Sequence, residues 1–259
     1  AEVDGTGVPM RASETAGRPG KGEDGQAGTR EVKLARLFTV SRLNEHGRPV
    51  MDPDSSSYVF TFDGKDTFAS LVKAEYLRRG GEHYRQVVAL GDGAAWIWSM
   101  AEDLYPHATH IVDIYHAREH LHDLAVLLAF ITPDPPAWLE QRSDELDAGN
   151  IDAILTAARA FPLAGARATE LDRQLGYFER NAHRMRCQHF RDPGMFTGSG
   201  AIEGGIKAII AQRAKQSGMH WTVEGAASII ALRSQHASGR WNDFVAPRPA
   251  PPATLRAAI

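Results

Sequence analysis

The sequence predicts an α/β protein in which a mixed sheet is flanked by helices and an all-helical insertion precedes the last helices. One observation is a series of short apolar runs rich in β-branched and aromatic residues. A second is that helical patterns separate the later runs, which gives the order β, β, β, α, β, α, β, α. The third is that no strand pattern occurs for about seventy residues after Glu119. The predicted strands lie at the start of the chain and at 32–40, 58–62, 87–90 and 111–112.

Composition narrows the class of protein. The chain has 259 residues, of which 43% are hydrophobic and 24% charged, so it can bury one large core or a core with a subdomain. It contains no apolar run long enough to span a bilayer and opens with no signal-peptide pattern, so we expect a cytoplasmic protein without a membrane partner. The single cysteine, Cys187, excludes an internal disulfide and a Cys-based zinc finger.

The segment from Gln86 to Leu121 is a predicted strand, helix, strand crossover. Its first apolar run stops at Asp92, and its second leads to Asp113 and His116. Polar residues at the carboxyl ends of parallel strands face the ligand crevice of such sheets. Asp92 is therefore predicted to lie where a site forms.

Composition and charge divide the rest of the chain. We predict a first part of an α/β core at 1–118, with a mobile hairpin tip at 11–28, and a helical insertion at 119–196 whose first half is acidic. Helices at 197–244 complete the core and are basic, and the Pro/Ala-rich tail at 245–259 is expected to be disordered. The net charge of -3 does not indicate a nucleic-acid binder, but acids and bases segregate along the chain.

Three acids lie at points where the predicted structure changes: Asp4 on the first strand, Asp92 after the fourth and Glu203 in the first turn of a late helix. Each has an ordinary explanation, such as a turn, a favourable helix dipole or an ion pair with Lys207. Together they match the ribonuclease-H-like layout for two-metal phosphoryl chemistry. Clustered carboxylates repel unless a cation joins them, and oxygen ligands favour Mg²⁺ or Mn²⁺.

Two other patterns compete with this interpretation. The residues His116-Ala117-Arg118-Glu119-His120 match H-x-x-E-H, a zinc-peptidase signature. That motif needs both histidines within a helix, whereas His116 follows an apolar strand directly, so the carboxylate site is favoured. Trp96 and Trp98 flank Asp92 and are expected to pack in the core, with stacking on a displaced base as the alternative.

Four blocks of the sequence, in order, are VDGTGVPM, LGDGAAWIW, IVDIYHAREHL and GSGAIEGGIKAIIAQRAKQSGMHW. Together they resemble the bacterial insertion-sequence transposases of the Kra type, nearly to Phe244. The resemblance implies a DDE transposase catalytic domain with a helical insertion before the glutamate. It implies Asp4, Asp92 and Glu203 as catalytic and metal-binding residues. It also implies Asp113 and His116 as auxiliary active-site residues.

The expected activity is metal-dependent cleavage and strand transfer at the ends of an insertion sequence, with two Mg²⁺ or Mn²⁺ ions. Lys207, Arg213 and Lys215 are expected to contact DNA phosphates. The partners expected are DNA and further copies of the chain assembled on it, within the nucleoid. Only three residues precede Asp4, so we expect the chain to begin partway into a longer protein. The alternatives are a non-catalytic DNA-binding or regulatory transposase fragment and a zinc hydrolase using the HAREH motif.

Overall fold

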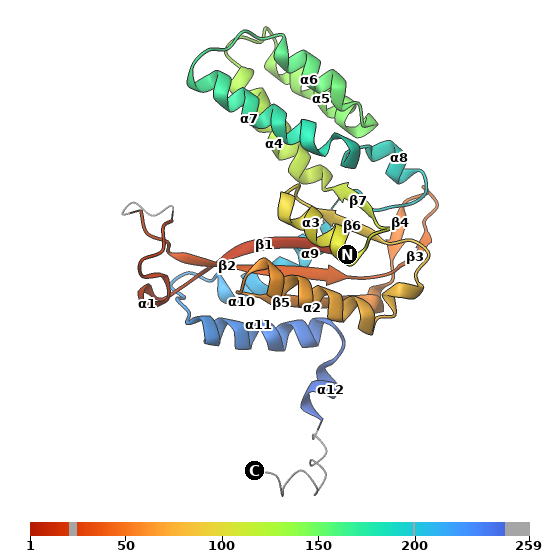
Figure 1. The fold of residues 1–259 in the computed structure, drawn as a ribbon, viewed down its shortest axis with the longest axis vertical. Coiled ribbons are helices and arrows are strands. Elements are labelled where there is room, and N and C mark those ends of the chain that lie inside the picture. The colour runs from red at the N-terminus through yellow and green to blue at the C-terminus, as the bar shows by residue number, and fades with distance from the viewer. Residues whose placement is uncertain (21–24, 199, 247–259) are drawn as a thin grey trace, which may run out of the picture.

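A five-stranded mixed sheet forms the centre of the protein in a computed structural model that describes residues 1–20, 25–198 and 200–246 (Figure 1). Its strand order is β5-β2-β1-β6-β7. Strand β2 runs antiparallel to β1 and β5, whereas β1, β6 and β7 are parallel to one another. The predicted mixed α/β sheet is thereby confirmed. The strands are β1 (Glu2–Pro9), β2 (Thr29–Leu37), β5 (Ser57–Thr61), β6 (Val88–Gly91) and β7 (Thr109–Val112).

The strand boundaries differ from the prediction in one region. The second strand spans Thr29–Leu37 rather than 32–40, and a separate hairpin of β3 (Val40–Leu43) and β4 (Pro49–Met51) follows it. The residues of β3 are all exposed, so no alternation of buried and exposed side chains indicated a strand there. The predicted hairpin tip at 11–28 contains a short helix, α1 (Ala12–Thr15), and residues 21–24 lie outside the described part.

Two helical layers cover the sheet. On one face, α2 (Lys65–Arg78) and α3 (Ala95–Leu104) bury side chains such as Phe68, Val72 and Ile97 against Val3 and Ala35 of the sheet. On the other face, α9 (Gly200–Gly205) and α11 (Val223–Ala237) bury Ile202 and Ile230 against Val8 and Leu34. Alternate residues of β1 therefore face different layers, as the two-residue period of a strand requires.

The helical insertion follows β7 and forms the upper lobe in Figure 1. A left-handed Gly149 ends one of its helices and the Asn150 side chain caps the next, as the sequence predicts. The first helix, α4, runs unbroken across the predicted boundary at 118/119, and one hydrophobic cluster continues from the sheet into the lobe. Its helices are α4 (Ile114–Leu128), α5 (Pro135–Ala148), α6 (Ile151–Arg159), α7 (Ala166–Asn181), the 3₁₀ turn η3 (Ala182–Arg184) and α8 (Cys187–Arg191).

The helix that begins with α9 contains an irregular middle. After α9 the segment η4 (Ile206–Ala211) is a π-helix, and α10 (Gln212–Ala214) completes the run. Ile209 and Ile210 of the π segment are buried, so the widened turn is fixed by packing. A short helix, α12 (Trp241–Val245), includes the first residue of the predicted disordered tail, and residues 247–259 lie outside the described part.

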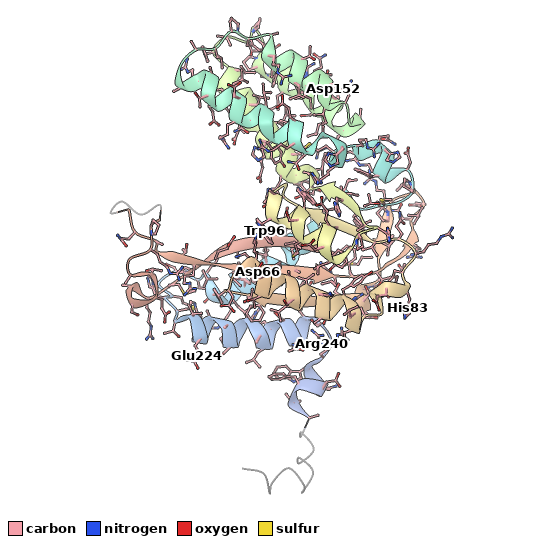
Figure 2. All side chains as sticks on the ribbon, viewed as in Figure 1. Asp66, His83, Trp96, Asp152, Glu224 and Arg240 are labelled. Atoms are coloured by element: carbon pink, nitrogen blue, oxygen red, sulfur yellow. The ribbon has the colours of Figure 1, made fainter. Side chains whose placement is uncertain are left out.

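An ion-pair clamp joins α2 to the residue before α12. Glu75 is 5% exposed and accepts hydrogen bonds from Arg78 and from Arg240, which is labelled where α11 and α12 meet in Figure 2. Burial raises the pKa of Glu75, but Arg78, Ser57 and Arg240 outweigh it and lower the pKa to about 2. Across the described ranges, the structure has no helix with the length and apolarity that a bilayer crossing requires.

Leu124→Ala tests whether the sheet and the insertion share one core. Leu124 is fully buried in the cluster that spans both, so its truncation should reduce the free energy of unfolding by about 2–5 kcal/mol. Val126→Ala, on the same helix at 62% exposure, should change it by less than about 0.5 kcal/mol. Urea denaturation followed by far-ultraviolet circular dichroism measures both. Two separate transitions in the wild type would contradict a shared core.

Glu75→Gln should reduce the free energy of unfolding at neutral pH by about 3 kcal/mol, because the pKa of Glu75 falls from 4.5 to about 2 and each unit of depression corresponds to about 1.4 kcal/mol. The folded pKa of Glu75 lies below its unfolded value, so the stabilisation is present above the unfolded pKa and is lost as pH falls toward about 2. Thermal unfolding of wild type and variant should therefore converge between about pH 4.5 and pH 2. Glu82→Gln is the exposed control. A difference in thermal stability between wild type and Glu75→Gln that stays constant across this pH range would contradict the stabilising role of the ion-pair clamp.

Candidate functional site

The register of the parallel strands places two of the predicted acids side by side. Glu2 of β1 lies opposite Leu90 of β6. Two positions further along each strand come Asp4 and Asp92, which therefore lie at the same level on adjacent strands. Adjacent strands are about 5 Å apart, so the two carboxylates can share one ligand. Strand β1, which carries Asp4, and strand β6, which ends one residue before Asp92, are adjacent as predicted. The convergence of the two carboxylates with Glu203 in one cleft stays a prediction.

A third aspartate continues this row. Gly91 of β6 lies opposite Val112 of β7, so Asp92 and Asp113, the residues that follow them, are also level. The backbone N–H of Asp113 donates to the Gly91 carbonyl at 2.9 Å and extends the ladder by one step. Asp4, Asp92 and Asp113 thus occupy one level across three neighbouring strands.

The charges in this row act on one another. Burial raises the pKa of Asp4, the N–H of Gly5 and the charge of His116 oppose the rise, and Asp92 and Asp113 add to it. Burial alone would lower the pKa of His116, but the carboxylates of Asp113, Glu119, Asp4 and Asp92 raise it above its ordinary value. The structure therefore brings Asp4, Asp92, Asp113 and His116 into one electrostatic cluster.

Local structure explains why His116 faces this cluster. Asp113 is fully buried, and its side chain caps α4 by accepting from the Tyr115 N–H at 3.1 Å. His116 lies one turn later, with Nε2 at 3.9 Å from Asp113 Oδ2 and Nδ1 at 3.2 Å from Glu119 Oε2. The first turn of α4 thus presents an imidazole beside the row of carboxylates.

The turn that carries Asp92 is held by helix α7 of the insertion. Tyr177 donates its hydroxyl proton to the Asp92 carbonyl at 2.9 Å. Asn181 accepts from the Trp98 indole N–H at 3.1 Å and donates to the Gly93 carbonyl at 3.5 Å. Gly93 has φ +100°, and a Cβ there would lie 2.6 Å from the Tyr177 ring. The insertion therefore fixes the backbone around Asp92.

Glu203 lies on α9, which packs on the face of the sheet toward which Asp4 points, since the strand partner of Asp4, Leu34, is buried there. Arg36 of β2 holds this helix by donating from Nη1 to the Ala201 carbonyl at 2.6 Å. Glu203 is exposed on this helix. Its role as the third acid stays a prediction.

Sequence reasoning missed Glu2, which precedes Asp4 by two residues on the same face of β1. Glu2 is 1% exposed, and burial raises its pKa to about 7 despite the nearby Ala1 amino group, the Ile202 backbone N–H and Arg36. The signal for it was a glutamate inside an otherwise apolar strand. Glu2 is thus a buried acid next to this region on β1, and it lines the cavity at the amino ends of β1 and β6.

The donor set fits a hard divalent cation in its chemistry. Asp4 accepts from the Gly5 N–H through Oδ1, and Asp92 accepts from the Ala94 N–H through Oδ1, at 2.6 and 2.8 Å. Each carboxylate is thus oriented by its own turn, with Oδ2 as the oxygen that could bind a cation. In the part of the chain described, no three His, Cys, Asp or Glu side chains are already arranged around one metal position.

The three basic residues predicted to contact DNA differ in their surroundings. Lys207 is exposed, Lys215 Nζ bonds Thr6 Oγ1 on β1, and Arg213 lies 5.1 Å over the Trp221 ring, so Arg213 also serves packing. The expectation that His116 precedes the helix is wrong. Both His116 and His120 belong to α4, because the Asp113 cap starts the helix directly after β7.

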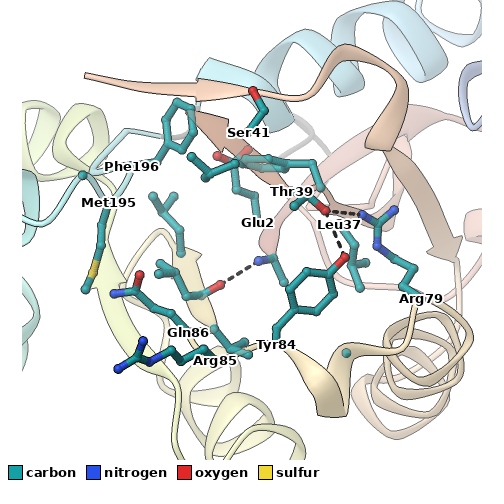
Figure 3. Close-up of a pocket in the computed structure, with 18 of the residues that line it drawn as sticks. Glu2, Leu37, Thr39, Ser41, Arg79, Tyr84, Arg85, Gln86, Met195 and Phe196 are labelled. Carbon is teal, nitrogen blue, oxygen red and sulfur yellow. Dashed lines mark hydrogen bonds between the residues drawn. The ribbon is translucent and has the colours of Figure 1, made fainter. Parts of the chain in front are cut away.

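Two cavities lie at opposite ends of the parallel strands. One, of about 610 Å³, is lined by Asp92, His116 and His120 together with residues of α3 and α7. The other, of about 470 Å³, lies at the amino ends of β1 and β6 and is shown in Figure 3. Glu2, Leu37, Tyr84 and Phe196 line it, but none of the predicted catalytic residues does. Of the predicted site residues, Asp92 and His116 line the first cavity, whereas Asp4, Asp113 and Glu203 line neither of the two.

No family model, curated protein or solved structure matches this chain. An assignment of function therefore rests on the sheet topology, the row of aspartates and the cavity beside Asp92.

Gly93→Ala should destabilise the protein by about 2–4 kcal/mol, because it adds a steric conflict with Tyr177 to the cost of a left-handed alanine. Gly218→Ala is the matched control, since its φ is +76° with no atom within 4 Å of the added Cβ. The control should lose only about 1–2 kcal/mol. Urea denaturation followed by tryptophan fluorescence measures both. Equal losses would show that α7 does not press on the Asp92 turn.

Proposed function

We propose that this chain is the catalytic domain of a DDE-type DNA transposase with a ribonuclease-H-like fold. The observation that carries the proposal is the row of Asp4, Asp92 and Asp113 at one level across β1, β6 and β7. The strand order β5-β2-β1-β6-β7, with β2 as the antiparallel strand, supports the same fold. So does the helical insertion between β7 and the helix that carries Glu203.

The protein groups have separate tasks in this mechanism. Asp4 and Asp92 would hold the catalytic cations, with Glu203 completing the set from α9. Two Mg²⁺ or Mn²⁺ ions held there would supply activation of a water or a 3′-hydroxyl and stabilisation of the leaving oxygen of the phosphodiester. The neighbouring carboxylates raise the pKa of His116 and so favour its protonated form, in which Nε2 can donate to a phosphate oxygen. Tyr177 and Asn181 keep the Asp92 turn in place from the insertion.

The topology also brings the sheet and the insertion together at the site. The helical insertion enters after β7 and returns before α9, so the catalytic acids come from segments on both sides of it. Its helix α7 contacts the Asp92 turn through hydrogen bonds between residues more than eighty positions apart. A DNA strand that enters the cavity beside Asp92 would therefore touch the sheet and the insertion together. Further copies of the chain on the DNA remain part of the proposal.

A zinc hydrolase is the second candidate, because His116 and His120 share helix α4 and line the same cavity. His120 is, however, committed elsewhere. Its Nδ1 shares a hydrogen bond of 2.7 Å with Gln174 Oε1, and its ring stacks on Tyr177 with centroids 3.6 Å apart. This packing accounts for His120 as part of the contact between α4 and α7, and the carboxylate site is the better supported of the two.

Nicking of supercoiled plasmid in Mn²⁺ tests the proposal. Asp92→Asn and Glu203→Gln should each lower the rate roughly a hundredfold or more, because loss of a metal ligand removes several kcal/mol of transition-state stabilisation. Glu224→Gln, an exposed glutamate in the first turn of α11, should leave the rate unchanged.

Circular dichroism spectra should show that all three variants fold. Undiminished nicking in Asp92→Asn would overturn the assignment of Asp92. Absence of nicking by the wild type would favour the regulatory-fragment alternative. Activity that needs Zn²⁺ and is lost in His120→Gln would favour the hydrolase.

A further inference from the structure

The cavity beside Asp92 has one wall from the sheet domain and another from the helical insertion. Asp92 and His116 line it on one side, with Ser99 of α3 nearby, and Arg180 and Arg184 line it from α7 and η3. Arg180 lies in the last turn of α7 and Arg184 at the end of the 3₁₀ turn η3 that follows it. The Arg184 guanidinium donates to the backbone carbonyl of Arg180 at 3.5 Å, and both residues line the same cavity, where they form a basic edge.

The two arginines differ in what already neutralises them. Arg184 is 12% exposed in its side chain, lies 4.8 Å over the Trp98 ring and pairs with Glu102 at 3.4 Å. Its Nε is buried and has no hydrogen-bond partner within the residues described. Arg180 is exposed, and no carboxylate in the described ranges forms an ion pair with it, whereas Arg173 on the same helix pairs with Glu170. The edge therefore offers donors that protein groups leave unused.

The aromatic residues around the cavity do not offer a stacking surface. Trp98 is 4% exposed and contacts both Arg184 and His110, so its ring belongs to the core. Tyr177 is 8% exposed and stacks on His120. A base would need an open aromatic face, whereas a phosphate needs only guanidinium and hydroxyl donors. The cavity thus suits a sugar-phosphate backbone.

We propose that Arg180 and Arg184 form a binding subsite for the phosphate of a DNA strand next to the phosphodiester at Asp92. This inference rests on the proposed function, because it places the neighbouring phosphodiester at the Asp92 row. It assigns the insertion a direct contact with substrate: Arg180 supplies the principal charge and Arg184 the second donor. Phosphate contacts of this kind position a strand without reading its sequence.

Binding of fluorescein-labelled single-stranded DNA in EDTA, measured by anisotropy over a series of KCl concentrations, tests the subsite apart from catalysis. Loss of one phosphate contact lowers the salt slope of a single strand by about 0.7. We expect Arg180→Gln to show this decrease together with roughly tenfold weaker binding at low salt. Arg180→Lys should retain the slope, because it keeps the charge.

Arg167→Gln is the control for a general loss of positive charge. Arg167 is an exposed arginine at the other end of α7, about 20 Å from Arg180 along the helix axis, and it lies over the Phe130 ring. The Arg167→Gln variant should leave both the salt slope and the affinity for single-stranded DNA unchanged. Circular dichroism confirms that each variant folds.

Equal salt slopes for wild type and Arg180→Gln would overturn the subsite, as would an absence of DNA binding by the wild type. The plasmid assay separates this result from the proposed function. If the salt slope falls only in Arg180→Gln and the wild type does not nick DNA, the subsite is supported as a nucleic-acid contact and the transposase proposal is weakened. If the wild type nicks DNA but its salt slope equals that of Arg180→Gln, the transposase proposal is supported and the subsite is overturned.

Discussion

The parallel pairing of β1, β6 and β7 is the constraint on which the candidate site depends. Backbone hydrogen bonds fix the level of each residue relative to the neighbouring strand, so the positions of Asp4, Asp92 and Asp113 follow from the register alone. A slip of one residue on β1 would turn Asp4 toward the layer that contains Phe68 and would place Val3 among the acids. The apolar faces on both sides of the sheet exclude that slip energetically.

The helical insertion is part of the same mechanical unit as the sheet. The cluster that buries Leu124 and Phe178 also contains Val3 and Ile97, so one hydrophobic core continues from the sheet into the insertion. The contacts of α7 with the Asp92 turn use both backbone carbonyls of the turn as acceptors. The geometry of the acids on the sheet is therefore set in part by side chains far away in the sequence.

Much of this arrangement could be predicted from local sequence signals. Apolar runs indicated the five central strands in order, and Gly149 and Asn150 marked a helix end and the next helix start. The exposed hairpin β3–β4 carried no such signal. Among site residues, Asp4, Asp92, Asp113 and His116 each stood next to a predicted strand end or turn.

The rest of the site depends on contacts that one sequence does not reveal. Tyr177 and Asn181 lie in an ordinary amphipathic helix, and nothing in their spacing indicated a partner 85 or more positions earlier. Arg180 looked like any solvent-exposed charge on that helix. Glu2 could be noticed as a polar residue in a strand, but its burial follows from the packing of α9 against the sheet.

The π segment Ile206–Ala211 has a consequence for how this protein could vary. A π turn is an α-helix with one additional residue, so deletion of one residue there would restore the ordinary helical period. Ile209 and Ile210 anchor the C-terminal part of this helix to the core. Deletion of one residue would therefore rotate the N-terminal part, α9, by about 100° relative to them. Glu203 lies in this N-terminal part. A single-residue length change in this helix would thus redirect Glu203 while the sheet and its aspartates stay unaltered, which makes chain length here a determinant of the direction in which that side chain points.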